Sequence, residues 1–195
     1  ALHTSRHKYG RVYPGRGWVV WRDTESLPED LVFRVSYLGG DMPTFALNFS
    51  RPGAQVLLQY YLFLRLGRTG YEAVQRTSRD VALYLSGEIA KMPAVELWNA
   101  GAAIPVIAWR LRAGRGKASD LYHLSERLRT KGWLVPAYPM PDDLTDLTVQ
   151  RVVVRNGFSH DLASAFLADL RDEVALLDAL TGPMPTEGQR SNFHH

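Results

Sequence analysis

The 195-residue chain is 46% apolar and carries 23 basic and 20 acidic residues, giving a formal net charge of +3. It is long enough for one large or two small domains with a buried core. Basic and acidic residues are interspersed, no apolar run reaches the 18 residues of a membrane span, and cysteine is absent, so we expect a soluble cytoplasmic protein without nucleic-acid, membrane or metal binding.

The first informative segment is the basic run of residues 4–10, which contains the adjacent pair His7-Lys8 followed by an aromatic residue and a glycine. A lysine amine becomes catalytic when nearby cations or a phosphate lower its proton affinity, or when a carbonyl compound holds it covalently. Most His-Lys pairs are solvated surface residues, however. The run by itself therefore leaves a catalytic and a surface interpretation open.

Three extended segments and a helical region follow. Residues 17–22 predict a short buried strand, and residues 31–38 and 44–49 predict the two arms of a hairpin around Gly39-Gly40. From Ala54 the apolar spacing becomes that of a helix. We expect Gly67 and Gly70 to interrupt it before a second helix, whose apolar face serves ordinary packing: Val74, Val81, Leu85 and Ile89.

The second half of the chain alternates strands and helices. Strands are predicted over residues 95–98, 104–111, 133–138 and 147–154. Pro105, inside the second of them, favours an edge position. Ser119 and Ser159 are candidate caps of two helices, and Gly132 is the expected end of the first. This interleaving predicts a compact α/β lobe.

Arg151 stands out because it lies within the β-branched run of residues 148–154. A planar cation there costs stability unless a carboxylate or phosphate meets it. Two other interpretations stay open at this point, a salt bridge to a core carboxylate and an exposed sheet face. The last segment, residues 189–195, is typical of a mobile polar tail.

Three strings in the chain resemble the glutamate decarboxylases, pyridoxal-phosphate enzymes of the group II decarboxylase family. They are His7-Lys8-Tyr9-Gly10 with residues 17–22, residues 37–52, and residues 124–133 with Pro136-Ala137. The resemblance covers essentially all of this chain but only the second half of the family's enzyme. It implies an α/β, fold-type I pyridoxal-phosphate transferase-like fold.

The resemblance also implies a domain organisation. Residues 1–70 would be the end of the large cofactor-binding domain, with the hairpin and the start of a long helix. Residues 71–182 would form the small C-terminal α/β domain, and residues 183–195 a flexible tail.

The resemblance further implies roles for individual residues. Lys8 would be the catalytic lysine that holds pyridoxal 5′-phosphate, and His7 would support the cofactor phosphate. Ser50 would reach the cofactor phosphate of a neighbouring subunit, and Arg151 would hold the substrate α-carboxylate. His195 would close the active site near neutral pH.

The implied activity is the decarboxylation of L-glutamate to 4-aminobutanoate and carbon dioxide by a homodimer or higher homo-oligomer. The residues that in relatives hold the phosphate, stack on the ring and pair with the pyridine nitrogen lie upstream of this chain's counterpart. Arg6, Arg11 and Arg16 replace a glycine, a hydrophobic residue and a small residue of the family pattern. Such arginines would crowd and charge the site, so we expect a fragment or a partly degraded copy.

Two alternatives remain. One is another pyridoxal-phosphate lyase or decarboxylase of the same fold, against which the string Tyr37-Leu38-Gly39-Gly40-Asp41 argues. The other is a non-catalytic subunit or interaction module that pairs with a full-length homologue.

Overall fold

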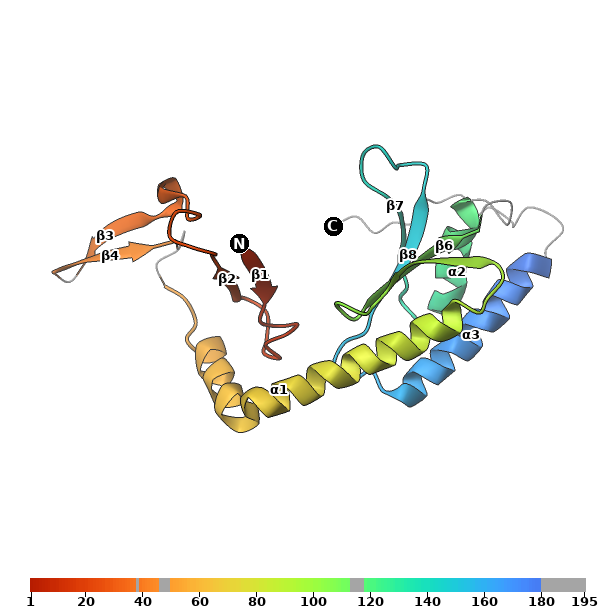
Figure 1. Ribbon diagram of the computed structural model, residues 1–195, viewed down its shortest axis with the longest axis horizontal. Helices are drawn as coiled ribbons and strands as arrows, with labels where there is room; N and C mark the ends of the chain where they lie inside the picture. Colours follow the sequence, from red (N-terminus) through yellow and green to blue (C-terminus); the bar gives the residue numbers. More distant parts are fainter. Residues whose placement is uncertain (38, 46–49, 113–117, 180–195) are drawn as a thin grey trace. The chain divides into compact units, whose positions relative to one another are not determined.

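A computed structural model describes residues 1–37, 39–45, 50–112 and 118–179 of the chain. The chain forms two compact units, Ala1–Glu72 and Ala73–His195, which are described separately below (Figure 1). The division lies close to the expected boundary at residue 70. The assignment of the two parts to the large and small domains of a longer enzyme stays a prediction.

The first unit begins with an antiparallel ribbon of β1 (Leu2–Ser5) and β2 (Gly17–Val20). The second strand lies where the sequence predicted one, but it is not buried, since Val19 is 47% and Val20 58% exposed. Among the residues that the structure describes, this sheet has two strands. A ribbon of this kind cannot cover both of its faces without a second layer, so the prediction of burial was wrong within this unit.

The predicted hairpin is confirmed. After the short 3-10 helix η1 (Glu29–Leu31), β3 (Phe33–Tyr37) pairs with β4 (Gly40–Thr44), and Phe33 lies opposite Thr44. The second arm begins at residue 40 rather than at residue 44, because Tyr37 pairs directly with Gly40 and the connection is only two residues long. Residues 46–49, which belong to the predicted second arm, lie outside the described residues.

The long helix α1 (Ala54–Ile89) is interrupted at Gly67, where φ is 57° and ψ is −169°. Essentially only glycine adopts this backbone conformation, because a Cβ atom would clash with the neighbouring peptide groups. The predicted break at Gly67 is therefore confirmed, whereas Gly70 lies within the continuing helix. Among the described residues, no helix is both long enough and apolar enough to cross a bilayer.

The second unit contains a four-stranded antiparallel sheet in the order β5-β6-β8-β7. Its strands are β5 (Val95–Ala100), β6 (Val106–Leu111), β7 (Ala137–Pro139) and β8 (Thr148–Val153). The prediction of an edge position for the strand after Pro105 was wrong, because β6 lies inside the sheet. Pro105 precedes β6 and removes no hydrogen-bond donor from its ladder.

Helix α2 (Ala118–Thr130) ends as the sequence predicted. Gly132 follows it with φ 90°, and the Trp133 N–H donates to the Leu128 carbonyl at 2.9 Å, which closes the last turn. This bond takes residue 133 out of the strand predicted over residues 133–138, and β7 begins only at Ala137. Ser119 lies inside the helix, so its assignment as the N-cap was wrong.

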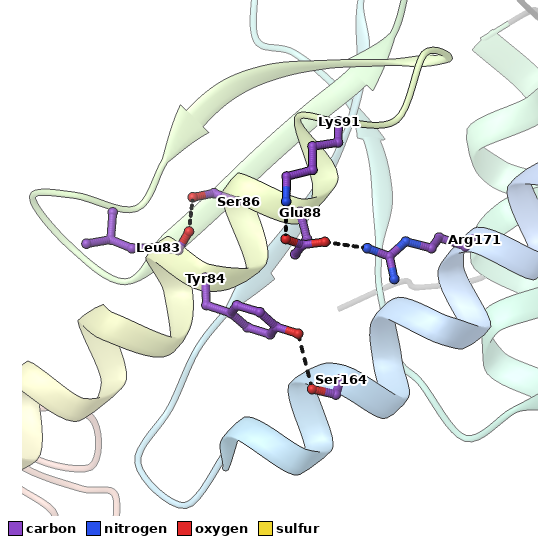
Figure 2. A network of polar contacts seen from close by, with 7 residues as sticks. All are labelled: Leu83, Tyr84, Ser86, Glu88, Lys91, Ser164 and Arg171. Carbon is purple, nitrogen blue, oxygen red and sulfur yellow. Dashed lines mark hydrogen bonds and ion pairs between the residues drawn. The ribbon is translucent and has the colours of Figure 1, made fainter.

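Helix α3 (His160–Ala179) is capped as predicted, because the Ser159 Oγ accepts a hydrogen bond from the Leu162 N–H at 3.2 Å. A network of polar contacts joins α3 to the second part of α1 (Figure 2). In it, Glu88 accepts hydrogen bonds from the Lys91 ammonium at 2.5 Å and the Arg171 guanidinium at 2.6 Å. The contact ties two helices that are far apart in the sequence.

The core of the second unit lies between these helices and one face of the sheet. Its fully buried members come from α1, β5, β6, α2 and α3, and include Leu85, Ile89, Val95, Ile107, Trp109, Leu124, Leu128, Phe166 and Leu170. Gln150 is buried among them, and its amide donates to the Ser125 hydroxyl at 2.9 Å and the Leu121 carbonyl at 3.3 Å. The NH2 group of this amide is thus paired inside the core, whereas the buried Gln150 Oε1 has no hydrogen-bond partner among the described residues.

Candidate active site

Lys8 lies in a turn formed by residues 6–10, directly after β1. The Lys8 N–H donates to the Ser5 carbonyl at 3.2 Å, and the Val12 N–H donates to the Arg6 carbonyl at 3.2 Å. The His7 and Lys8 residues themselves are exposed within this unit. The backbone of the turn is therefore held by hydrogen bonds, while the amine that the sequence singled out is accessible.

Gly10, at the end of this turn, is buried in a close fit. A Cβ atom there would lie 2.4 Å from the Gln59 Oε1, 2.6 Å from the Trp18 ring and 2.7 Å from the Arg6 carbonyl oxygen. Real Cβ atoms do not approach other atoms so closely, so the position requires glycine. The Gly10 carbonyl accepts hydrogen bonds from the Gln59 Nε2 at 3.2 Å and the Tyr71 hydroxyl at 3.1 Å.

An aromatic stack supports the same turn. The Arg6 guanidinium lies 4.9 Å from the Trp18 ring centroid, Trp18 stacks on Phe63 at 6.0 Å, and Phe63 meets Tyr71 at 5.5 Å. The Arg6 Nε and Nη1 atoms are buried and have no hydrogen-bond partner among the described residues. A buried guanidinium nitrogen without an acceptor is costly, so these two donors are suited to an anionic group.

The other two arginines that depart from the family pattern are accommodated locally. The Arg16 Nη2 donates to the Pro52 carbonyl at 2.9 Å, at the start of the chain segment that leads into α1. Arg11 has φ 62°, a left-handed conformation that is uncommon for residues other than glycine. Arg16 is thus held by a backbone carbonyl of this unit, and Arg6 lies against the Trp18 ring.

The segment around Lys8 is strongly electropositive. Residues 1–22 contain five lysines and arginines, two histidines and no acidic residue, and Asp23 is the first carboxylate of the chain. The Asp23 pKa is lowered by hydrogen bonds from the Ser26 hydroxyl and the Ser26 N–H, so this carboxylate is engaged by its own turn. A group of cations of this kind attracts anionic ligands.

The remaining predicted site residues are distributed as follows. Ser50 is exposed in the first unit, and Arg151 is exposed in the second, on β8 opposite Ala108 of β6. The Arg151 guanidinium lies 5.6 Å from the Tyr138 ring centroid. This exposed position fits both the exposed sheet face and a carboxylate-binding role, and the latter stays a prediction. His195 lies outside the described residues.

The open hollow on the β1–β2 ribbon, of about 370 Å³, is lined by residues 3–5 and 17–19. A second hollow, of about 310 Å³, lies in the other unit and is lined by residues of α1, α3 and the segment 91–94. Neither Lys8 nor Arg151 contributes to these two hollows. The roles predicted for His7, Lys8, Ser50 and Arg151 stay predictions.

Sequence reasoning missed the two side chains that bind the Gly10 carbonyl. Gln59 is only 2% exposed and lies in an otherwise apolar helical stretch, which is a signal that could have singled it out. Tyr71 offered no comparable signal. Its partner Gly10 is 61 positions away, and no local pattern connects the two residues.

Comparison with known proteins gives the class of this chain. Residues 1–112 match the family model described as the pyridoxal-dependent decarboxylase conserved domain. The chain therefore belongs to the pyridoxal-dependent decarboxylase family.

Comparison with individual relatives points to one group within this family, the glutamate decarboxylases. The chain is 44% identical over 178 residues to the glutamate decarboxylase of Lactococcus lactis subsp. cremoris (strain MG1363), which covers 91% of this chain and 38% of that protein. The structure of the Lactobacillus brevis CGMCC 1306 glutamate decarboxylase matches with a TM-score of 0.78 at 47% identity, covering 91% of this chain and 40% of that one. The resemblance inferred from the three strings is confirmed.

A more distant structure, the sphingosine-1-phosphate lyase of Burkholderia pseudomallei K96243, matches with a TM-score of 0.70 at 21% identity. It covers 89% of this chain and 37% of its own, and shows a likeness of fold alone. Together these structures confirm the predicted α/β fold class. The chain spans about 40% of the length of the relatives it matches.

Proposed function

We propose that this chain supplies the catalytic lysine of a pyridoxal 5′-phosphate-dependent decarboxylase that converts L-glutamate to 4-aminobutanoate and carbon dioxide. The observation that carries the proposal is the exposed Lys8 on a hydrogen-bonded turn, in an electropositive segment of a chain 44% identical to a glutamate decarboxylase. The proposed activity would belong to a complete enzyme, and this chain matches about 40% of the length of such relatives.

The residues present fit the cofactor chemically. Pyridoxal 5′-phosphate carries an aldehyde, which combines with a primary amine such as Lys8, and a phosphate, which requires cations. His7 and the two unpaired guanidinium nitrogens of Arg6 are available to such an anion. When bound, the cofactor supplies an electron sink for the pair left behind when carbon dioxide departs.

Each remaining site residue has a role suited to its chemistry. Lys8 would hold the cofactor covalently and His7 would support its phosphate. Ser50 would donate its hydroxyl to the phosphate of a neighbouring subunit's cofactor. His195 would close the site near neutral pH, since a histidine titrates in that range.

Arg151 is the proposed receptor of the substrate α-carboxylate. Its guanidinium is exposed and lies against the Tyr138 ring, so the planar group is presented by a defined surface of β8. A guanidinium binds a carboxylate through two parallel hydrogen bonds. Arg151 would thereby orient L-glutamate so that the bond to the leaving carboxylate can break.

Assembly into a homodimer or higher homo-oligomer is supported by the first part of α1. Five of its large apolar side chains are 46–70% exposed and recur at helical spacing: Val56, Leu57, Tyr60, Tyr61 and Leu64. A surface of this kind marks an interaction site. The cytoplasmic location expected from the composition stays a prediction.

The experiment that tests this function is covalent trapping. The protein is mixed with pyridoxal 5′-phosphate, its visible spectrum is recorded, and the product of borohydride reduction is mapped by mass spectrometry. We expect one pyridoxyl group on Lys8, which is lost in Lys8→Ala and retained in Lys131→Ala, a control at another exposed lysine. Equal labelling of both lysines, or unchanged labelling after Lys8→Ala, would contradict the proposal.

A second candidate function, an interaction module that pairs with a full-length homologue, is favoured by the same exposed apolar face of α1. Release of carbon dioxide from labelled L-glutamate separates the two candidates. An enzyme loses this release after Lys8→Ala. A module would leave the release by its co-purified homologue unchanged by that substitution.

A further inference from the structure

We infer that Gln59 and Tyr71 are positioning residues that hold the Lys8 turn through the carbonyl group of Gly10. The inference rests on the proposed function, because the position of the turn matters only if Lys8 binds the cofactor. It concerns residues of the first unit alone.

Three hydrogen bonds converge at this point. The Gly10 carbonyl accepts from the Gln59 Nε2 at 3.2 Å and from the Tyr71 hydroxyl at 3.1 Å, and the Gln59 Nε2 also lies 2.8 Å from the Tyr71 hydroxyl oxygen. The reversed amide would place the Gln59 Oε1 against the Gly10 carbonyl oxygen, two acceptors without a proton between them. The amide therefore has one favourable orientation, with its donor toward the turn.

The interruption of α1 at Gly67 makes this convergence possible. Residues 59 and 71 are twelve positions apart, which in a straight helix corresponds to about 18 Å along the axis. Their side chains nevertheless form a hydrogen bond, because α1 bends at Gly67 (Figure 1). A backbone conformation available essentially to glycine thus brings both donors to the Gly10 carbonyl.

The result is a turn that is held at both ends. Ser5 pairs with Gly17 in the β1–β2 ribbon, and Gly10 is held by α1. Lys8 lies between these two points. Because the backbone on each side of Lys8 is fixed, the origin of its side chain is fixed as well, as pre-organisation of a catalytic group requires.

The hydrogen bonds from Gln59 and Tyr71 to the Gly10 carbonyl, called the tether below, are tested first without cofactor, by hydrogen–deuterium exchange. In Tyr71→Phe and in Gln59→Met, which removes the donors but keeps similar volume, we expect the Lys8 and Val12 amides to exchange faster. The expected factor for Tyr71→Phe is about 3 to 10, which corresponds to one neutral hydrogen bond of ordinary net strength. Amides of the β3–β4 hairpin serve as the folding check for the first unit, which contains the turn, and amides of β6 serve for the second. Unchanged exchange in the turn would overturn the inference.

The matched control is Tyr61→Phe. Tyr61 lies on the same helix, is 59% exposed, and has no part in the contact with Gly10. We expect it to leave exchange in the turn unchanged. Acceleration of the turn by Tyr61→Phe equal to that by Tyr71→Phe would also overturn the inference, since any loss of a tyrosine hydroxyl would then suffice.

The positioning role is tested next with cofactor. In Tyr71→Phe we expect borohydride still to label Lys8, but the visible circular dichroism per bound pyridoxal 5′-phosphate to fall, because the chromophore is held less rigidly. A loosened turn with unchanged dichroism would overturn the positioning role. Failure of the parent chain to be labelled at Lys8 would instead overturn the proposed function, while the exchange experiment still reports on the tether.

The role of the bend is tested by Gly67→Ala. We expect it to loosen the turn at least as much as Gln59→Met, because both donors move away together. The control is Gly87→Ala on the same helix, where an added Cβ meets nothing within 4 Å. If Gly67→Ala leaves exchange of the Lys8 turn as in the parent, the bend does not position the donors and that part of the inference is wrong.

Discussion

The two units of the chain use similar apolar content in different ways. The buried cluster of the second unit runs from Val81 to Val174 and brings α1, α2, α3 and the sheet together. In the first unit, Val12 is the one described large apolar side chain that is buried, and most of the large apolar residues that the described chain exposes lie before residue 65. The second unit completes its own core, whereas the first presents apolar surface.

This contrast shows that an apolar pattern predicts a secondary-structure element more securely than it predicts burial. Strand β2 and the first part of α1 form where the pattern indicates, yet Val20 is 58% and Leu57 70% exposed. Burial requires a second layer, and the described residues of the first unit form two-stranded ribbons, the short η1 and the first part of α1 to provide it. The first unit therefore relies more on individual hydrogen bonds, such as those to the Gly10 carbonyl, than on a buried apolar core.

The largest expected effect is loss of a core aromatic side chain in the second unit. Phe166 is 2% exposed and packs against Trp133 at a centroid distance of 5.4 Å. We expect Phe166→Ala to lower the free energy of unfolding by about 3–5 kcal/mol, because it leaves a cavity among fixed neighbours. Tyr13→Ala, at a position of the first unit that is 74% exposed, should change it by less than about 0.5 kcal/mol. Urea unfolding measures the free energy of unfolding of both variants. Similar losses would contradict the view that the two units differ in apolar burial.

A smaller difference in stability is expected when an ion pair is removed from each of the two units. Glu173 is 4% exposed and accepts a hydrogen bond from Arg127, so Arg127→Met would leave a buried carboxylate without its cation. We expect a loss of about 1–3 kcal/mol. In the first unit, Arg34 lies 2.9 Å from Asp41, but both side chains are more than half exposed. Arg34→Met should therefore cost no more than about 1 kcal/mol.

Urea unfolding of the two methionine variants provides the measurement. Each substitution retains much of the apolar stem of its arginine, so the difference between them reports mainly on the charge. A larger loss for Arg34→Met than for Arg127→Met would contradict the view that the buried ion pair of the second unit stabilises the fold more than the exposed pair of the first.

The smallest expected effect is a loss of folding stability at low pH. The hydrogen bond from the Lys91 ammonium is the largest cause that lowers the Glu88 pKa below its usual 4.5; contacts with Arg171 lower it further, and burial opposes them. Glu88 therefore contributes stability at pH values above its usual pKa, and this contribution is lost as the pH falls through the lowered pKa. The contact between Glu88 and Arg171 joins α1 to α3 (Figure 2). Loss of the Glu88 charge should therefore lower the stability of the second unit against global unfolding.

Unfolding midpoints between about pH 6 and pH 3 test this expectation. The parent protein should lose more stability on acidification than Glu88→Gln, so the difference between them narrows as the pH falls. Asp23→Asn is the control from the first unit, because the lowered pKa of Asp23 comes from Ser26 only three residues away. Parallel curves for the parent and Glu88→Gln would show that the α1–α3 contact does not depend on this charge.

The sequence by itself determined the features that depend on neighbouring residues. The hairpin around Gly39, the break at Gly67, the end of α2 at Gly132 and the cap at Ser159 each follow from backbone preferences within a few positions. The family strings likewise singled out Lys8, because a short motif lies within one stretch of chain.

Only the tertiary structure decided which elements are covered and which distant residues meet. It placed the strand after Pro105 inside the sheet, and it joined Gly10 to Gln59 and Tyr71 across 49 and 61 positions. No local pattern contains such pairings, because they depend on the bend of a helix and on what packs against it. Burial and long-range hydrogen bonds are properties of the assembled fold, and the candidate site depends on both.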